Sequence, residues 1–239
     1  MTRHFGNIRL ITFDLFDTLY APTEPVSRTY ARPLWRQGIK IDEATVAAAF
    51  YQAFKDARRE YPNYGYAASM SSRQWWDIII RRTWSNVNVD VSKYPKLASE
   101  IPQLIDYFGN GKGYTMFPEV PKVLKYLRRK GVKMGVVSNM DESGEKILAY
   151  LGIREYFDFV IQSIKVGVEK PDPRIYNMAM TAVSVPPFDS LHVGDSELLD
   201  YLPAKEAGME AILVTRNRDG VEWDSQKHID SLSRLLELV

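Results

Sequence analysis

The apolar residues of this 239-residue chain follow two different spacings. Residues 8–14 (Ile-Arg-Leu-Ile-Thr-Phe-Asp) form a nearly continuous apolar run that ends on an aspartate, which is typical of a strand buried in a parallel sheet. From about residue 21 to residue 115, apolar and aromatic side chains recur at helical spacing. Helix candidates lie at 47–54 and 72–80, and loop signals lie at 61–65 and 109–113. The pattern predicts a helical segment inserted after the first strand.

Helices and strands alternate strictly after Pro118. Helices are predicted over 120–130, up to Gly152, from Asp172, up to Gly208 and over 229–238, and strands over 134–138, 159–163, 191–194 and 211–214. Asp172 is expected to cap its helix, with Pro173 in the first turn. Repeated strand–helix units imply a parallel sheet with right-handed crossovers. The predicted fold class is α/β: a Rossmann-like parallel-sheet core of residues 1–20 and 116–239, with an inserted helical cap domain at residues 21–115.

Composition narrows the class of protein. Hydrophobic residues make up 45% and charged residues 26% of the chain, the usual mix for a globular protein. The 31 basic residues nearly balance the 30 acidic ones, which argues against a dedicated nucleic-acid or membrane-surface binder. The chain contains no cysteine, so disulfides, thiolate zinc sites and cysteine nucleophiles are excluded. The absence of cysteine also fits a reducing compartment.

The start of the chain and its apolar runs lack the patterns of a targeting signal. The first seven residues contain no apolar region followed by a small-residue cleavage site. No apolar stretch approaches the roughly 18 residues that suggest a membrane span. We therefore expect a cytoplasmic protein with neither nucleic acid nor a membrane as its partner.

Candidate chemistry lies where two predicted strands end. Asp14 follows the first strand, and Asp195 follows the strand over 191–194. Strand carboxyl ends gather along one edge of an open parallel sheet, and such folds bind ligands at that edge. Two carboxylates brought together there offer the hard oxygen donors that Mg²⁺ prefers. The three histidines, His4, His192 and His228, show no metal-ligand spacing and are given no role.

Four segments on that predicted edge carry a family resemblance. They are Asp14-Leu-Phe-Asp-Thr18, Val-Val-Ser138-Asn139, Val-Glu-Lys170-Pro-Asp-Pro, and Gly194-Asp195 followed by Asp200. In order and form they resemble the four motifs of the haloacid dehalogenase-like (HAD) hydrolase superfamily. The helical insert stands where that superfamily carries its C1-type cap. Segments 61–65 and 71–76 further resemble one subgroup of the superfamily.

The resemblance implies a role for each motif residue. Asp14 would be the nucleophile that forms a covalent aspartyl intermediate. Asp14, Asp195, Asp200 and the main-chain carbonyl of Phe16 form the implied Mg²⁺ site, and Asp200 would alternatively orient Lys170 or a metal-bound water. The substrate-binding residues implied are Thr18, Ser138, Asn139 and Lys170, with Ser138 and Lys170 also counted as catalytic. The implied activity is hydrolysis of a small phosphorylated metabolite through an aspartyl-phosphate.

Phe16 departs from the phosphatase pattern. The phosphatases of the superfamily carry a second aspartate two residues after the nucleophile, where it protonates the leaving group and later activates water. Phe16 performs neither task, and general acid–base help is typically worth roughly 10²–10⁴ in rate. Asp17, one position further on, is expected to point elsewhere. Aryl and acyl phosphates, which have good leaving groups, would suffer least.

Two other functions remain open. The haloacid dehalogenases of the superfamily also place an aromatic residue at this position, attack carbon and use no metal. They need a cap arginine, and Arg36 resembles it in sequence but lies closer to the nucleophile than expected. Asp195 and Asp200 retain the metal-type fourth motif and favour phosphoryl chemistry. A non-catalytic protein that binds a phosphorylated ligand or a protein partner is the third candidate.

Two cap residues are further substrate-binding candidates. Trp75 belongs to a group of aromatic residues that would line an apolar substrate pocket or, alternatively, form the core of a small helical bundle. Arg73 would meet a substrate anion or, alternatively, form a salt bridge within the cap. The sequence leaves both alternatives open.

Overall fold

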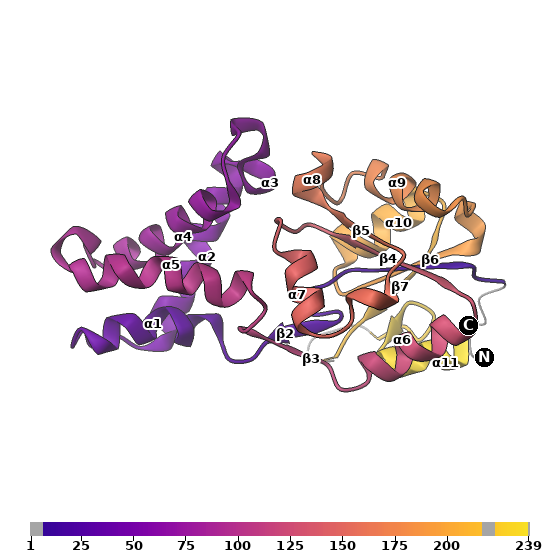
Figure 1. The fold of residues 1–239 in the computed structure, drawn as a ribbon, viewed down its shortest axis with the longest axis horizontal. Helices are drawn as coiled ribbons and strands as arrows, with labels where there is room; N and C mark the ends of the chain where they lie inside the picture. The colour runs from indigo at the N-terminus through magenta and orange to yellow at the C-terminus, as the bar shows by residue number, and fades with distance from the viewer. Residues whose placement is uncertain (1–6, 217–222, 239) are drawn as a thin grey trace. The chain divides into compact units, whose positions relative to one another are not determined.

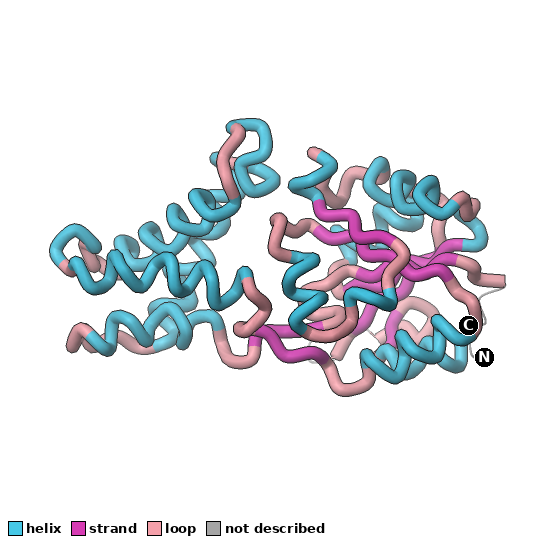
Figure 2. Tube along the Cα trace, in the orientation of Figure 1, coloured by secondary structure: helices cyan, strands magenta, loops and turns pink. Residues whose placement is uncertain are grey.

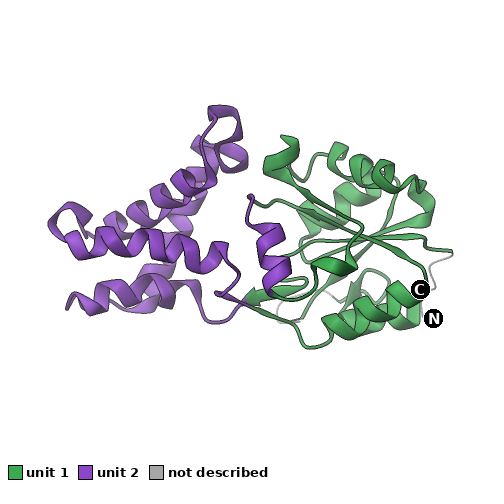
Figure 3. Ribbon diagram, in the orientation of Figure 1, with its two compact units in different colours: residues 1–21, 115–140, 151–239 green, residues 22–114, 141–150 purple. Residues whose placement is uncertain are grey.

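The computed structural model describes residues 7–216 and 223–238. The chain divides into two compact units (Figure 3). Unit 1 comprises residues 1–21, 115–140 and 151–239, and unit 2 comprises residues 22–114 and 141–150. The division falls within one residue of the predicted boundaries at 20/21 and 115/116, but it also assigns residues 141–150 to unit 2. Whether the units act as a catalytic core and a cap domain stays a prediction.

Unit 1 is built on a parallel sheet, which confirms the predicted α/β fold class. Within the described residues the sheet has six strands. In spatial order they are β5 (Phe159–Gln162), β4 (Lys133–Ser138), β1 (Leu10–Phe13), β6 (Ser190–Gly194), β7 (Glu210–Val214) and β8 (His228–Ile229). Strand β1 is buried along its whole length, because it pairs with β4 on one side and with β6 on the other.

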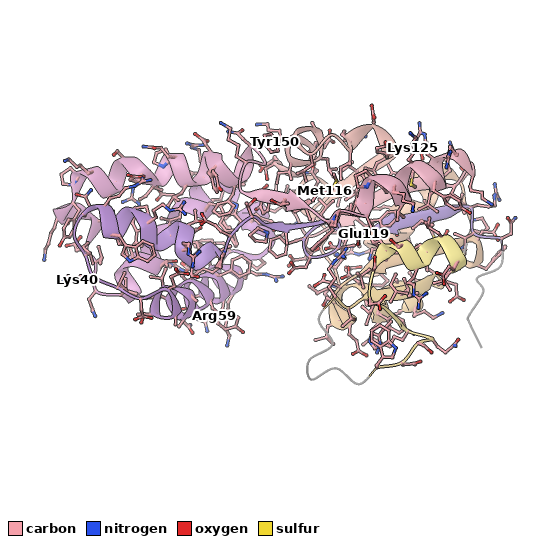
Figure 4. All side chains as sticks on the ribbon, turned by 90° about the horizontal axis from the view of Figure 1, so that it is seen from below. Lys40, Arg59, Met116, Glu119, Lys125 and Tyr150 are labelled. Atoms are coloured by element: carbon pink, nitrogen blue, oxygen red, sulfur yellow. The ribbon has the colours of Figure 1, made fainter. Side chains whose placement is uncertain are left out.

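Helices cover both faces of this sheet. Figure 1 shows α9 (Arg174–Val183) and α10 (Leu202–Glu206) on one side of it, and α6 (Val120–Arg129) and α11 (Leu235–Leu238) on the other. The short helix α8 (Ser163–Val166) follows β5. In α6 the buried residues are Val120, Val123, Leu124 and Leu127, the i, i+3, i+4, i+7 spacing of a helix with one apolar face. Lys125 of α6, labelled in Figure 4, is exposed.

The strand order determines where a site can form. The chain enters the sheet at its centre with β1, proceeds outward through β4 and β5, and then returns to the other side of β1 with β6. Such a reversal is a topological switch point, where open α/β sheets bind ligands beside the strand carboxyl ends. Asp14, Ser138 and Asp195 lie at the carboxyl ends of β1, β4 and β6, respectively.

Unit 2 is mainly helical, as the cyan segments of Figure 2 show. Its helices are α1 (Val26–Arg36), α2 (Glu43–Glu60), α3 (Pro62–Gly65), α4 (Ser72–Asn86), α5 (Pro95–Gly109) and α7 (Gly144–Tyr150). Helix α4 begins at a capping box, in which the Ser71 side chain accepts a hydrogen bond from the Gln74 amide and the Gln74 side chain accepts one from the Ser71 amide. Lys40 and Arg59, labelled in Figure 4, belong to the exposed surface. A small sheet of β2 (Tyr20–Pro22) and β3 (Tyr114–Met116) lies where the chain passes between the units.

Several local predictions were wrong. The helix predicted over 229–238 begins instead with β8, because His228 and Ile229 pair with β7. The extended Ser231 then starts a separate turn at Leu232–Arg234 before α11. Pro173, rather than Asp172, holds the cap position of α9, although the Asp172 carboxylate still accepts the Arg174 amide hydrogen at an N···O distance of 2.9 Å. The predicted loop at 61–65 contains the short segment α3, but Asn63 and Tyr64 within it have left-handed, non-helical backbone angles, so the prediction of a turn between the two longer helices holds.

None of the helices in the described part of the chain combines the length and the apolar character needed to cross a membrane.

Candidate active site

The first strand delivers Asp14 to the edge of the sheet. The Asp14 amide donates to the carbonyl of Val193 at 2.9 Å, so the residue remains in register with β6. The chain then turns sharply: Asp17 adopts a left-handed conformation with φ 55° and its amide donates to the carbonyl of Tyr20. Aspartate tolerates this conformation better than most residues do. The turn leaves the Asp14 side chain almost wholly buried.

A buried ammonium group lies between two carboxylates at this edge. Lys170 Nζ donates to Asp14 Oδ1 at 2.6 Å and to Asp200 Oδ1 at 2.5 Å. The Lys170 side chain is 2% exposed. A buried charge of this kind is strongly unfavourable unless it is paired and hydrogen-bonded. The two aspartates supply both requirements, although they come from opposite ends of the chain.

Asn139 holds the main chain at Lys170. Its side-chain amide donates to the Lys170 carbonyl at 2.8 Å, and its Oδ1 accepts the Lys170 amide hydrogen at 2.7 Å. The Asn139 side chain therefore positions Lys170. Substrate binding by Asn139 stays a prediction. Ser138, the last residue of β4, is buried directly beside it in the chain.

Asp200 is held by donors on both carboxylate oxygens. Oδ2 accepts the Ser196 amide hydrogen at 3.0 Å, and Oδ1 lies 3.1 Å from His192 Nε2 in addition to its contact with Lys170. Gly194 makes room for this carboxyl group, because a Cβ at that position would lie 2.2 Å from Asp200 Cγ. The glycine before Asp195 is thus required by packing against Asp200.

Burial and charge act in opposite directions on these groups. Burial raises the pKa of Asp14, and the Lys170 charge opposes that rise. Burial also disfavours the charged form of Lys170, but Asp14 and Asp200 outweigh it and raise the pKa of the ammonium. For Asp200, burial is overcome by Lys170 and the His192 hydrogen bond, which hold the pKa of that carboxyl well below its usual range. Lys170 is therefore a cation and Asp200 an anion at neutral pH.

Three carboxylates lie close enough together to hold a metal ion. One oxygen each of Asp14, Asp195 and Asp200 lies within 4.8 Å of the others. Asp195 is the exposed member and has no hydrogen bond or ion pair among residues 7–216 and 223–238. Although the residue as a whole is exposed, partial desolvation of its carboxyl, together with repulsion from Asp14 and Asp200, raises the pKa of Asp195 to about 7. When all three carboxylates are ionised, the single ammonium of Lys170 leaves a net charge of two negative units at the cluster. This set of oxygen donors therefore fits Mg²⁺.

Phe16 and Thr18, two further motif residues, differ in how far they are exposed to solvent. Phe16 is 41% exposed, and its backbone pairs with that of Tyr20. Thr18 is fully buried, and its hydroxyl has no partner in the part of the chain that the structure describes. Metal binding by the Phe16 carbonyl and substrate binding by Thr18 stay predictions.

The two cap candidates make contacts within unit 2. Trp75 is 1% exposed, donates from Nε1 to the Tyr61 carbonyl at 3.0 Å and packs against Phe54 and Tyr64. Arg73 forms an ion pair with Asp106 at 2.6 Å. These contacts match the bundle-core and salt-bridge alternatives, so substrate binding by either side chain stays a prediction.

Two polar residues of the buried network, His192 and Thr12, have no predicted role from the sequence. His192 on β6 contacts Asp200, and its Nδ1 lies 2.8 Å from the hydroxyl of Thr12 on β1. Both side chains are fully buried. The available signal was a polar residue inside each of two otherwise apolar strands. Histidine spacing gave no such signal, because the partners come from different strands.

The chain is similar to known proteins over nearly its whole length. A family model described as haloacid dehalogenase-like hydrolase matches residues 8–208. The "Haloacid dehalogenase-like hydrolase domain-containing protein 3" of Mus musculus is 38% identical, covering 98% of this chain and 94% of that protein. The 2-haloacid dehalogenase of Pseudomonas syringae pv. Tomato has a similar structure, with a TM-score of 0.65, 25% identity and 97% coverage of both chains. A HAD phosphatase of Thermococcus onnurineus has a TM-score of 0.63 at 22% identity, covering 96% of this chain and 97% of its own.

Replacing Lys170 with methionine tests the electrostatic balance. We expect Lys170→Met to lower the free energy of unfolding at pH 8 by about 3–5 kcal/mol, because Asp14 and Asp200 lose their buried counter-charge. Their folded-state pKa values then rise above the unfolded values, so the deficit should shrink as the pH falls from 8 to 5. Urea denaturation of both proteins across this range measures the effect. Lys205→Met, which removes a partly exposed lysine paired with Glu210, should change stability little; a deficit at Lys170 that is independent of pH would contradict the argument.

Proposed function

This chain belongs to the haloacid dehalogenase-like hydrolase family, and we propose that it is a Mg²⁺-dependent hydrolase of a small phosphorylated metabolite. The observation that carries the proposal is the clustering of Asp14, Asp195 and Asp200 beside the Lys170 ammonium. A site built for metal-free attack on carbon has no need of a third carboxylate. Bound Mg²⁺ would shield the negative charges of nucleophile and phosphate from each other.

Asp14 would act as the nucleophile. Lys170 contacts its Oδ1, which leaves Oδ2 to attack phosphorus while the bond to the leaving oxygen breaks and that oxygen keeps the electron pair. Water would then attack the aspartyl-phosphate, restore the Asp14 carboxylate, release inorganic phosphate and lose its proton to solvent. The Lys170 ammonium would stabilise the charge of the transferring group. Ser138, Thr18 and the Asn139 amide are proposed to bind phosphoryl oxygens.

Phe16 limits the substrates that such a site can use. The phenyl ring at the usual acid–base position donates no proton, so the leaving oxygen departs as an anion. Substrates whose leaving groups have low pKa values, such as aryl or acyl phosphates, are therefore favoured over alkyl phosphates. The exposed ring also offers an apolar surface to such a leaving group.

Unit 2 is proposed to serve as the cap. Closure of a cap excludes water and selects the substrate, and such steps limit the rate of many enzymes.

We propose that the reaction takes place in the cytoplasm, because a chain without cysteine suits a reducing compartment.

A dehalogenase is the second candidate. Phe16 and the structural similarity to a 2-haloacid dehalogenase favour it. Arg36, the residue that resembles a dehalogenase carboxylate-binding arginine, forms an ion pair with Glu100 at 3.1 Å.

A pseudoenzyme that only binds a phosphorylated ligand or a protein partner is the third candidate, since fold alone does not decide function.

Hydrolysis of p-nitrophenyl phosphate separates these candidates. The proposal expects turnover that requires Mg²⁺, stops with EDTA and falls by roughly 10³-fold or more in Asp14→Asn. The matched control Asp56→Asn changes a partly exposed helical aspartate of unit 2 and should retain activity. Chloride release from 2-chloropropionate that is indifferent to EDTA would establish the dehalogenase instead. Mg²⁺ binding without turnover over a broad substrate panel would establish the pseudoenzyme.

Restoring a carboxylate at position 16 tests the role of Phe16. We expect Phe16→Asp to raise kcat/KM for alkyl phosphates by roughly 10²–10⁴-fold, because the new side chain can protonate the leaving oxygen. The gain for p-nitrophenyl phosphate should be much smaller. Phe16→Asn has nearly the same size without the exchangeable carboxyl proton, and an equal gain there would show that space, rather than proton transfer, was limiting.

Mg²⁺ affinity should depend on pH through Asp195. With a pKa of about 7, this carboxyl is mostly protonated at pH 6 and mostly ionised at pH 8, and the proton competes with the metal. We expect the apparent Kd for Mg²⁺ to fall about tenfold from pH 6 to pH 8 in calorimetric titrations. Asp195→Asn should bind weakly at both values. An unchanged Kd in the unmodified protein would remove Asp195 from the metal site.

A further inference from the structure

The site contains a buried histidine that the proposed reaction does not use. His192 lies on β6 directly beside Thr12 of β1 in the sheet register, and both side chains are fully buried. The ring of Tyr176 packs edge-on against the imidazole, with the ring centroids 4.9 Å apart. Packing therefore holds the imidazole in one orientation, with a polar partner at each nitrogen.

The partners determine which nitrogen carries the proton. Ionised Asp200 can only accept hydrogen bonds, so Nε2, 3.1 Å from its Oδ1, must be the donor. In a neutral imidazole only one of the two ring nitrogens carries a proton. Nδ1 is then the acceptor, and the Thr12 hydroxyl donates to it at 2.8 Å. The network allows a single tautomer.

This tautomer completes a directional series of contacts. The Thr12 hydroxyl donates to His192, His192 donates to Asp200, and Asp200 accepts a hydrogen bond from Lys170, which also donates to Asp14. A lysine side chain has many rotamers, and its ammonium group has no directional preference of its own. The Asp200 carboxylate supplies that direction only while its own plane is fixed. Ser196 holds one of its oxygens and His192 the other.

We propose that His192 is a positioning residue of this active site, which through its Nε2–H fixes Asp200 and, through it, the Lys170 ammonium against Asp14. His192 contacts neither nucleophile nor substrate, so its effect on rate passes through Lys170. The kinetic part of the inference depends on the proposed hydrolase function. Its structural part does not.

Enzyme kinetics provide the first test. In His192→Leu we expect kcat for p-nitrophenyl phosphate to fall roughly 10–100-fold with KM changed less than about threefold, because misplaced catalytic groups weaken the transition state more than substrate binding. His192→Gln keeps an N–H donor for Asp200 and should recover most of kcat. His228→Leu replaces another buried histidine of the same sheet and should retain kcat. Equal losses in the Leu and Gln variants, or an unchanged kcat in His192→Leu, would overturn the proposal.

Nuclear magnetic resonance provides a test that needs no turnover. Long-range ¹H–¹⁵N correlation in the unmodified protein should show His192 as the neutral Nε2–H tautomer at pH 7.5. The Lys170 side-chain resonances should shift in His192→Leu and stay unchanged in His228→Leu. An Nδ1–H tautomer, or unchanged Lys170 resonances in His192→Leu, would contradict the inference. If no substrate is hydrolysed at all, the proposed function fails while these spectra still decide the role of His192; if His192→Leu does not fold, the tautomer and the Gln variant decide it.

Discussion

The buried ammonium of Lys170 is the interaction on which the site depends. It lies between Asp14 and Asp200 with almost no solvent contact, and a charge in that position is tolerated only while both carboxylates remain in place. The three residues come from three separate segments of the chain. The parallel sheet must therefore close with β1 between β4 and β6 before the charge is compensated. The contacts that stabilise unit 1 are therefore the same contacts that position Asp14, Lys170 and Asp200.

Several residues near the Lys170 ammonium restrict the conformation of the main chain around the site. Asn139 binds both the amide and the carbonyl of Lys170, and Gly194 leaves the space that the Asp200 carboxyl fills. Asp17 adopts a left-handed conformation, which turns the chain shortly after Asp14. These residues contribute through geometry, and they explain why the motifs extend beyond the charged groups themselves.

Phe16 separates this chain from an ordinary phosphatase of the family. The carboxylates Asp14, Asp195 and Asp200 retain a donor set suited to a divalent cation, whereas the exposed phenyl ring removes a group for proton transfer. Similar folds are found in both a dehalogenase and a phosphatase, so the fold permits both chemistries. The balance of charge at the sheet edge is the physical reason to favour attack on phosphorus.

Local sequence patterns were enough to predict the α/β fold class and the placement of Asp14, Ser138 and Asp195 at strand ends, because strand burial and helix spacing depend on neighbouring residues. The family was predicted from the resemblance of the four motifs. They were not enough where a residue's state depends on distant partners. His228 and Ile229 form a strand because β7 offers them hydrogen bonds, and residues 141–150 group with unit 2 although they follow a core strand. The contact of Thr12 with His192 joins residues 180 positions apart. Sheet register and side-chain packing decide such contacts, and only the tertiary structure contains them.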